Sequence, residues 1–294
     1  MKKTTLNRRG FIEKTLVAGA AGMVAPGLLR SATASATPGM VTDDISLAQW
    51  ALVQEIREGK WKTLDFPRIA REDFGINGIE FVNTLFEVPT ASYLHRLKKN
   101  AEDHGVKMVL IMVDDEGETC TPSGKDRKQT VVNHQKWIDI AHFLGCHSIR
   151  TNCRGPEGAP KEEALEWAAE TYHMMLEYAV QAKIGVLIEN HGGLSNDADW
   201  MVQLFEKVDN YYFGSYPDWR GGPGPSDFDN VGYLKKMLPY AGGQSYRNQV
   251  TEELSAEMIR ISHDGGYRGW YGIESSGRDA IREGKEILTK YLGL

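Results

Sequence analysis

The chain has 294 residues with 34 basic and 40 acidic side chains, which gives a formal net charge of −6. A net acidic surface repels nucleic acid and anionic membranes, and no basic stripe interleaved with aromatic residues interrupts it, so a nucleic-acid partner is not expected. The length fits one large α/β domain with ample residues for a buried core.

Residues 1–36 are predicted to be an export signal. The run Asn7-Arg8-Arg9-Gly10-Phe11-Ile12 resembles the twin-arginine motif, an apolar stretch covers 15–29, and Ala32-Thr33-Ala34-Ser35-Ala36 offers the small residues of a cleavage site. A membrane anchor is the alternative, but about fifteen weakly apolar residues are few for a bilayer span. We therefore expect cleavage after Ala36, a periplasmic protein without stable membrane insertion, and one domain over 37–294.

Removing this segment makes the chain more acidic. Residues 1–36 hold six basic residues and one acidic residue, so 37–294 carries 28 basic and 39 acidic residues and a net charge of −11.

The three cysteines are Cys120, Cys146 and Cys153, without CxxC spacing. Because Cys146 and Cys153 flank one predicted strand, they would lie too far apart to bridge, and buried free thiols are expected.

Past the signal, strand-like runs alternate with amphipathic helical stretches. The runs cover 45–50, 78–82, 107–113, 147–152, 185–189, 211–215, a poor one at 240–246, and 270–274. The clearest helical stretch is 161–183, whose apolar residues fall on one face. Eight strands alternating with helices over about 250 residues predict a (β/α)8 TIM barrel. No Gly-x-Gly-x-x-Gly follows the first strand, which disfavours a dinucleotide-binding sheet.

Two of these runs end in a glutamate, Glu189 and Glu274, each followed within a few residues by glycine. A carboxylate at the edge of a core needs compensation, and a TIM barrel places its chemistry at the carboxyl ends of the strands. With Asp218 after the sixth strand, these acids could converge on Mg²⁺ or Mn²⁺, which favour oxygen ligands. Alternatively, the glutamates are structural ion pairs, for example with Arg150, and Asp218 begins an Asx turn.

Other polar and aromatic side chains at strand ends are candidates for binding a substrate. Three acids, Asp114-Asp115-Glu116, follow the third strand and suit sugar hydroxyl groups, although they could equally form a solvated loop. The glycine- and proline-rich stretch 220–227 follows the sixth strand and could cover the site. The predicted substrate-binding residues are Gln49, Trp50, Glu80, Asn152, His191 and Trp219, of which the tryptophans could stack on a sugar ring.

Several motifs resemble the xylose isomerase-like barrels, described as sugar phosphate isomerases and epimerases and related in fold to endonuclease IV. They are Ser46-Leu47-Ala48-Gln49-Trp50, Gly78-Ile79-Glu80-Phe81-Val82-Asn83, Ile188-Glu189-Asn190-His191-Gly192-Gly193, Pro217-Asp218 and Gly266-Tyr267-Arg268-Gly269-Trp270-Tyr271-Gly272-Ile273-Glu274. The resemblance covers essentially all of 37–294. It implies a divalent metal held by Glu189, Asp218 and Glu274, with the two glutamates as the catalytic residues that move the proton.

Strand seven departs from that pattern. Such barrels usually carry a histidine ligand there, whereas this chain reads Leu238-Pro239-Tyr240-Ala241-Gly242-Gly243-Gln244-Ser245-Tyr246-Arg247. Gln244 is the predicted fourth metal ligand, because an amide oxygen suits Mg²⁺ or Mn²⁺. Otherwise the fourth ligand is missing, the metal binds weakly, or the site works without one.

The resemblance implies an exported, metal-assisted isomerase or epimerase that acts on a small carbohydrate by proton transfer next to its carbonyl. A lyase or hydratase on oxidised sugars or glycosides begins with the same step and is the main alternative. A sugar-binding barrel without activity is the third possibility. Endonuclease activity is disfavoured because neither a histidine-rich zinc site nor a basic groove is visible.

Overall fold

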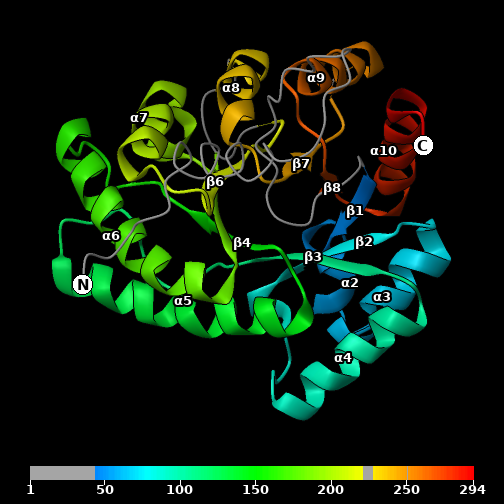
Figure 1. Ribbon diagram of the computed structural model, residues 1–294. Coiled ribbons are helices and arrows are strands. Elements are labelled where there is room, and N and C mark those ends of the chain that lie inside the picture. Colours follow the sequence, from blue (N-terminus) through cyan, green and yellow to red (C-terminus); the bar gives the residue numbers. More distant parts are fainter. Residues whose placement is uncertain (1–43, 221–227, 250) are drawn as a thin grey trace, which may run out of the picture.

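Eight short parallel strands form the centre of the structure (Figure 1), a computed structural model that describes residues 44–220, 228–249 and 251–294. Strands buried on both faces read as nearly continuous apolar runs, as in the fully buried β2 and β5. The strands are β1 (Asp44–Ala48), β2 (Gly78–Val82), β3 (Lys107–Met112), β4 (Ser148–Asn152), β5 (Gly185–Glu189), β6 (Phe213–Tyr216), β7 (Gln244–Tyr246) and β8 (Trp270–Ile273).

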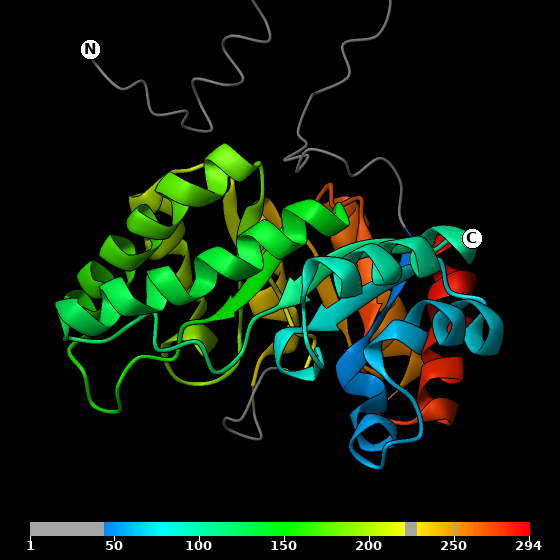
Figure 2. The ribbon, with the colours of Figure 1, turned by 90° about the horizontal axis from the view of Figure 1, so that it is seen from below.

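Helices surround the strands on the outside (Figures 1 and 2). The two longest, α5 and α6, lie side by side in both views and pack against each other. The helices are α2 (Val53–Arg57), α3 (Phe66–Arg68), α4 (Ala91–Asp103), α5 (Gly124–Leu144), α6 (Lys161–Ala182), α7 (Ala198–Val208), α8 (Asn230–Met237), α9 (Glu252–Asp264) and α10 (Arg278–Leu292). None of the described helices is long and apolar enough to cross a membrane.

The sheet runs in the order β6-β5-β4-β3-β2-β1-β8-β7 and is almost closed into a barrel. Between β6 and β7, the parallel bridges Ser215 to Ala241 and Asp218 to Ser245 close the remaining gap. There the Ser245 amide donates to the Pro217 carbonyl at 3.0 Å, and the Trp219 amide donates to the Ser245 carbonyl at 3.1 Å. The predicted (β/α)8 TIM barrel is therefore confirmed.

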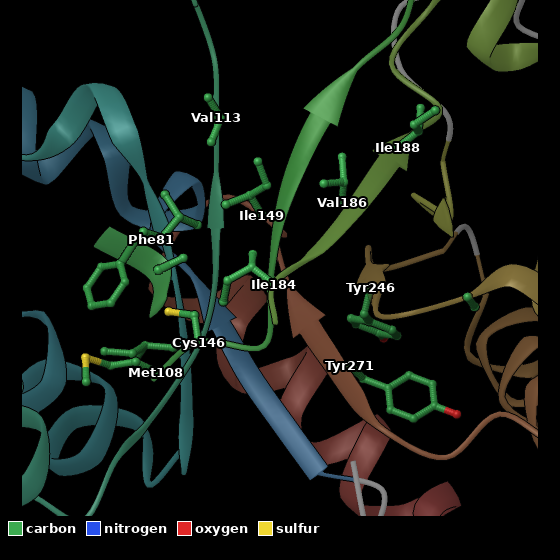
Figure 3. Close-up of a cluster of buried hydrophobic side chains, with 14 of the residues drawn as sticks. Phe81, Met108, Val113, Cys146, Ile149, Ile184, Val186, Ile188, Tyr246 and Tyr271 are labelled. Carbon is green, nitrogen blue, oxygen red and sulfur yellow. The ribbon is translucent and has the colours of Figure 1, made fainter. Parts of the chain in front are cut away.

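Side chains that alternate along the strands separate into an inner and an outer apolar cluster, except in β3, where a register shift puts the neighbouring Val109 and Leu110 both in the inner cluster. The inner cluster fills the barrel and includes Ala48, Val82, Leu110, Leu187 and Tyr216. The outer cluster lies between strands and helices, and Figure 3 shows part of it. Since a strand turns successive side chains to opposite faces, a shift of one residue decides whether a side chain faces the barrel interior or the helices.

Strand seven is shorter than predicted. The run predicted over 240–246 forms a strand only from Gln244, because Leu238–Tyr240 is a 3₁₀ turn with Pro239 near its start. The sixth strand likewise spans Phe213–Tyr216 rather than 211–215.

All three cysteines lie in the described part of the chain and are buried and free, as predicted. The predicted export signal over 1–36, the start of the domain at 37 and most of the predicted covering loop fall outside the described residues.

Candidate active site

Three carboxylates from three different strands meet at the carboxyl end of the barrel. Glu189 is the last residue of β5, Asp218 lies two residues beyond β6, and Glu274 directly follows β8. One carboxylate oxygen of each residue lies within 4.8 Å of those of the other two, and all three side chains are buried. The parallel strands thus bring together three acids, of which the first and the last, Glu189 and Glu274, are 85 positions apart in the sequence. We call these three residues the acidic triad.

Arg150 on β4 compensates the charge of Glu189. Its Nε atom lies 2.8 Å from Glu189 Oε2, and its Nη1 atom donates to Asp114 Oδ1 at 2.7 Å. Asp114 follows β3 and also accepts a hydrogen bond from the Asn152 amide at 2.8 Å. Arg150 therefore joins the ends of β3, β4 and β5 beneath the mouth of the barrel.

Arg247, just after β7, compensates the charges of Asp218 and Glu274. Its Nε donates to Asp218 Oδ2 at 2.8 Å, and its Nη2 lies 3.0 Å from Glu274 Oε1. Its Nη1 donates to the Glu274 backbone carbonyl at 2.9 Å, which fixes the guanidinium in place. The Ser245 hydroxyl donates to the remaining oxygen, Glu274 Oε2, at 2.7 Å. Every member of the acidic triad therefore has an arginine beside it.

The three carboxylates do not titrate alike. Burial raises the pKa of Asp218 to about 7 and also raises the pKa of Glu274, and the Glu189 charge adds to both shifts, whereas Arg247 opposes them. Burial alone would raise the pKa of Glu189 as well, but the Arg150 charge lowers it to about 2. Glu189 therefore stays ionised at neutral pH, while Asp218 and Glu274 accept a proton more readily.

A cavity of about 480 Å³ opens above the acidic triad. Of the three acids only Glu274 lines it, because Glu189 and Asp218 lie deeper in the protein. Acidic residues of the loop after β3 form one wall, and the arginines Arg150, Arg154 and Arg247 contribute positive charge. The lining also includes Trp50, Asp114, Asn152, His134, His191 and Ser276. A cavity of this size and polarity suits a small polyhydroxylated molecule.

The donor set of the acidic triad fits a divalent cation. Carboxylate oxygens are hard ligands of the kind that Mg²⁺ and Mn²⁺ prefer. Glu189 is completely buried, yet within the described part of the chain neither of its carboxylate oxygens has a hydrogen-bond partner of good geometry. A bound cation would compensate such a group.

The predicted substrate-binding residues divide into two groups. Trp50, Asn152 and His191 line the cavity. The Trp50 indole donates to Asp114 Oδ2 at 3.3 Å, and His191 Nδ1 lies 3.6 Å from Glu189 Oε1. These three side chains, together with Glu274, are the predicted site residues that a molecule in the cavity would touch.

Three other predicted residues face away from the cavity. The Trp219 indole donates to Gln244 Oε1 at 2.8 Å, and the Gln244 amide donates to Ser262 on α9 at 3.1 Å. Gln49 accepts from the Val82 amide and donates to Thr63. The structure therefore corrects the interpretation of Gln244 as a metal ligand and of Gln49 and Trp219 as sugar-binding residues. For Gln244 the reason is strand parity, since Ser245 rather than Gln244 turns its side chain into the barrel. Gln49 and Trp219 lie just beyond the ends of β1 and β6, where the buried hydrogen bonds to Thr63, the Val82 amide and Gln244 hold them.

Glu80 lies inside the barrel but below the cavity. It accepts hydrogen bonds from the Ser46 hydroxyl at 2.7 Å and from the Tyr216 hydroxyl, and burial raises its pKa to about 7. A Cβ atom at Gly272 would overlap the buried Glu80 carboxylate, so β8 has glycine where this side chain crosses it. Glu80 is thus a polar support beneath the acidic triad and does not contact the cavity.

Sequence reasoning missed Arg247, and it considered Arg150 only as a structural partner of the glutamates. The signal for Arg247 was available in the segment Gln244-Ser245-Tyr246-Arg247, where alternation puts Ser245 and Arg247 on the same side. Recognising it required the register of β7, which is a strand of only three residues.

The profile of a protein family described as the xylose isomerase-like TIM barrel matches residues 69–220. No curated protein matches the sequence significantly. Solved structures with the same fold include the probable 3-DHS dehydratase AsbF from Bacillus anthracis, with 18% identity and a TM-score of 0.67 over 84% of this chain and 98% of that chain.

A second similar structure is D-psicose 3-epimerase with D-tagatose from Clostridium cellulolyticum H10, with 14% identity and a TM-score of 0.66 over 85% of this chain and 98% of that chain. A third is a xylose isomerase-like TIM barrel protein from Mycobacterium smegmatis in complex with magnesium. It has 15% identity and a TM-score of 0.62 over 85% of this chain and 95% of that chain. At these identities the likeness concerns the fold.

Proposed function

The chain belongs to the xylose isomerase-like TIM barrel family, and we propose that it is an exported enzyme that isomerises or epimerises a small sugar by proton transfer next to the carbonyl. The observation that carries this proposal is the position of Glu274. It is a buried carboxylate with a raised pKa that lines the cavity, with two further carboxylates directly behind it. The sugar epimerase among the similar structures agrees with this chemistry.

Glu274 is the proton-transfer group in this proposal. A general base must reach the proton that it removes, and of the three acids only Glu274 lines the cavity. The Ser245 hydroxyl donates to Glu274 Oε2, and Arg247 pairs with Oε1, so both oxygens are held at the wall of the cavity. Burial raises the pKa of Glu274 toward neutral pH, and a carboxyl group with such a pKa can both accept and donate a proton efficiently.

Side chains around the cavity supply binding and orientation. Asp114 and Asn152 are polar groups suited to sugar hydroxyls, and the Trp50 ring offers an apolar face for stacking. The guanidinium groups of Arg150 and Arg247 also line the cavity and would stabilise negative charge that develops on the substrate's carbonyl oxygen.

A divalent metal, Mg²⁺ or Mn²⁺, is part of the proposal. Glu189, Asp218 and Glu274 would hold it, and when bound it polarises the carbonyl and neighbouring hydroxyl oxygens of the sugar. Glu189 is kept ionised by Arg150 and is therefore suited to be a ligand. Its predicted second role, as the catalytic partner of Glu274 in proton transfer, requires that a substrate reaches below the present cavity floor.

Solvent exchange tests this proposal directly. The protein loaded with Mn²⁺ or Mg²⁺ is incubated in D₂O with a panel of aldoses, ketoses and keto-sugars, and deuterium uptake is followed by NMR. Exchange at a carbon next to a carbonyl is expected, and Glu274→Gln should abolish it. Glu257→Gln serves as the matched control, because Glu257 is an exposed glutamate of α9 that does not line the cavity.

The products decide between the alternatives. Exchange with a rearranged sugar supports the isomerase or epimerase, whereas exchange with loss of water or of a substituent would assign the protein to the lyases or hydratases. If sugars bind but none exchanges in the presence of metal, the proposal is wrong and the protein is a sugar-binding barrel.

A further inference from the structure

We propose that Arg247 is an internal counter-cation that competes with a divalent metal for Asp218 and Glu274, so that this one side chain sets the metal affinity of the site. The inference rests on the proposed function, because it concerns the cation that the acidic triad would hold. It assigns a regulating role to a residue that directly follows β7 and does not depend on which sugar is the substrate.

The contacts of Arg247 carry the argument. Its guanidinium uses Nε for Asp218 Oδ2 at 2.8 Å and Nη2 for Glu274 Oε1 at 3.0 Å. The other two oxygens are also engaged, since Asp218 Oδ1 accepts from the Arg220 amide at 2.7 Å and Glu274 Oε2 accepts from Ser245 at 2.7 Å. Two of the three acids in the triad are thus satisfied by the chain itself.

A guanidinium cannot share these carboxylates with a metal at no cost. It has only donors, so it cannot act as a ligand, and its positive charge repels a second cation within a few ångströms. Metal binding to Asp218 and Glu274 therefore requires that Arg247 withdraws or that its charge is tolerated nearby. Either route lowers the affinity.

Arg150 differs from Arg247 in both contacts and surroundings. It is 2% exposed, is shared with Asp114, and leaves both Glu189 oxygens without a well-formed hydrogen bond among the described residues. Arg247 is 22% exposed and lines the cavity, so there is space into which it can move. Of the two arginines, Arg247 is therefore the one that can give way to a metal.

Titration calorimetry with Mn²⁺ alone tests this role without any substrate. Arg247→Met, which keeps much of the side-chain volume and removes the charge, should bind Mn²⁺ at least about tenfold more tightly than the unaltered protein. Without metal this variant should unfold at a lower temperature, because Asp218 and Glu274 lose their counter-charge, and Mn²⁺ should restore its melting temperature.

Two further variants separate this role from a general effect of removing an arginine. Arg278→Met also removes an arginine that pairs with two carboxylates, Glu55 and Asp73, outside the cavity, and should leave Mn²⁺ affinity unchanged. Asp218→Asn introduced into Arg247→Met should cancel the gain, which places the bound Mn²⁺ at the triad. If Arg247→Met does not fold, Arg247→Gln makes the same comparison.

Equal or weaker Mn²⁺ binding by the Arg247 variant would overturn the inference. That result is distinct from a failure of the proposed function, which is judged by deuterium exchange. Tighter binding in a protein that exchanges no sugar would keep the role of Arg247 and reject the activity.

Discussion

The Arg150 guanidinium lies 2.8 Å from the Glu189 carboxylate, and both side chains are almost completely buried beneath the cavity. A buried pair of this kind contributes little net stability compared with apolar residues, but removing one partner leaves the other charge uncompensated. The same pair lowers the pKa of Glu189 and joins β4 to β5. Its integrity therefore matters for the fold and for the proposed chemistry together.

Arg150→Met should destabilise the protein by about 3–5 kcal/mol, because Glu189 and Asp114 both lose their counter-charge. Urea unfolding followed by circular dichroism measures this change. The double variant Arg150→Met/Glu189→Gln should recover part of the lost free energy of unfolding, because the uncompensated Glu189 charge is then removed. A loss below about 1 kcal/mol in the single variant would show that the pair is not needed to compensate Glu189.

The raised pKa of Glu80 predicts that the free energy of unfolding depends on pH. Its pKa is raised by burial from 4.5 to about 7 in the folded protein. The folded state therefore holds a proton that the unfolded state releases more easily, and this contribution is complete below about pH 4.5 and lost as the pH rises through 7.

Glu80→Gln removes this titration while keeping a polar group beside Ser46 and Tyr216. Relative to the unaltered protein, the variant should gain up to about 3 kcal/mol between pH 5 and pH 9. Denaturant unfolding at a series of pH values checks the slope. A stability difference that does not change with pH would contradict the raised pKa.

Gln244 should matter for stability and not for metal. Gln244→Leu leaves the buried Trp219 indole and Ser262 hydroxyl without this partner, which should cost about 1–3 kcal/mol. Its affinity for Mn²⁺ should equal that of the unaltered protein, whereas Asp218→Asn should weaken binding. Calorimetry on the two variants side by side makes the comparison. Weaker Mn²⁺ binding in Gln244→Leu would reinstate Gln244 as part of the site.

The export signal is open to a simple test. Replacing Arg8 and Arg9 with lysine should retain the protein in the cytoplasm of a host that has twin-arginine export, because that pathway reads the arginine pair. Lys14→Arg is the control and should be exported. Mass spectrometry of the exported chain should find Thr37 as its first residue. Export of the double lysine variant would contradict the assignment of the pathway.

The alternation of strands and helices was enough to predict the barrel, because period-two and period-3.6 patterns are local properties of the sequence. The acids Glu189, Asp218 and Glu274 could also be anticipated, since the carboxyl ends of all strands meet at one end of a barrel. Trp50, Asn152 and His191 were predicted on the same basis, and they line the cavity.

Strand parity and long-range pairing were decided only by the tertiary structure. Gln244 and Ser245 are adjacent in the sequence, yet one turns to Ser262 on α9 and the other to Glu274 in the barrel. A register shift of one residue exchanges the two faces, and a three-residue strand carries too short a pattern to reveal it. The pairing of Arg247 with Asp218 and Glu274 depends on the closure of β6, β7 and β8, which no local pattern encodes. The sequence by itself thus determined the barrel and its acids, whereas the fold determined which cations lie beside them.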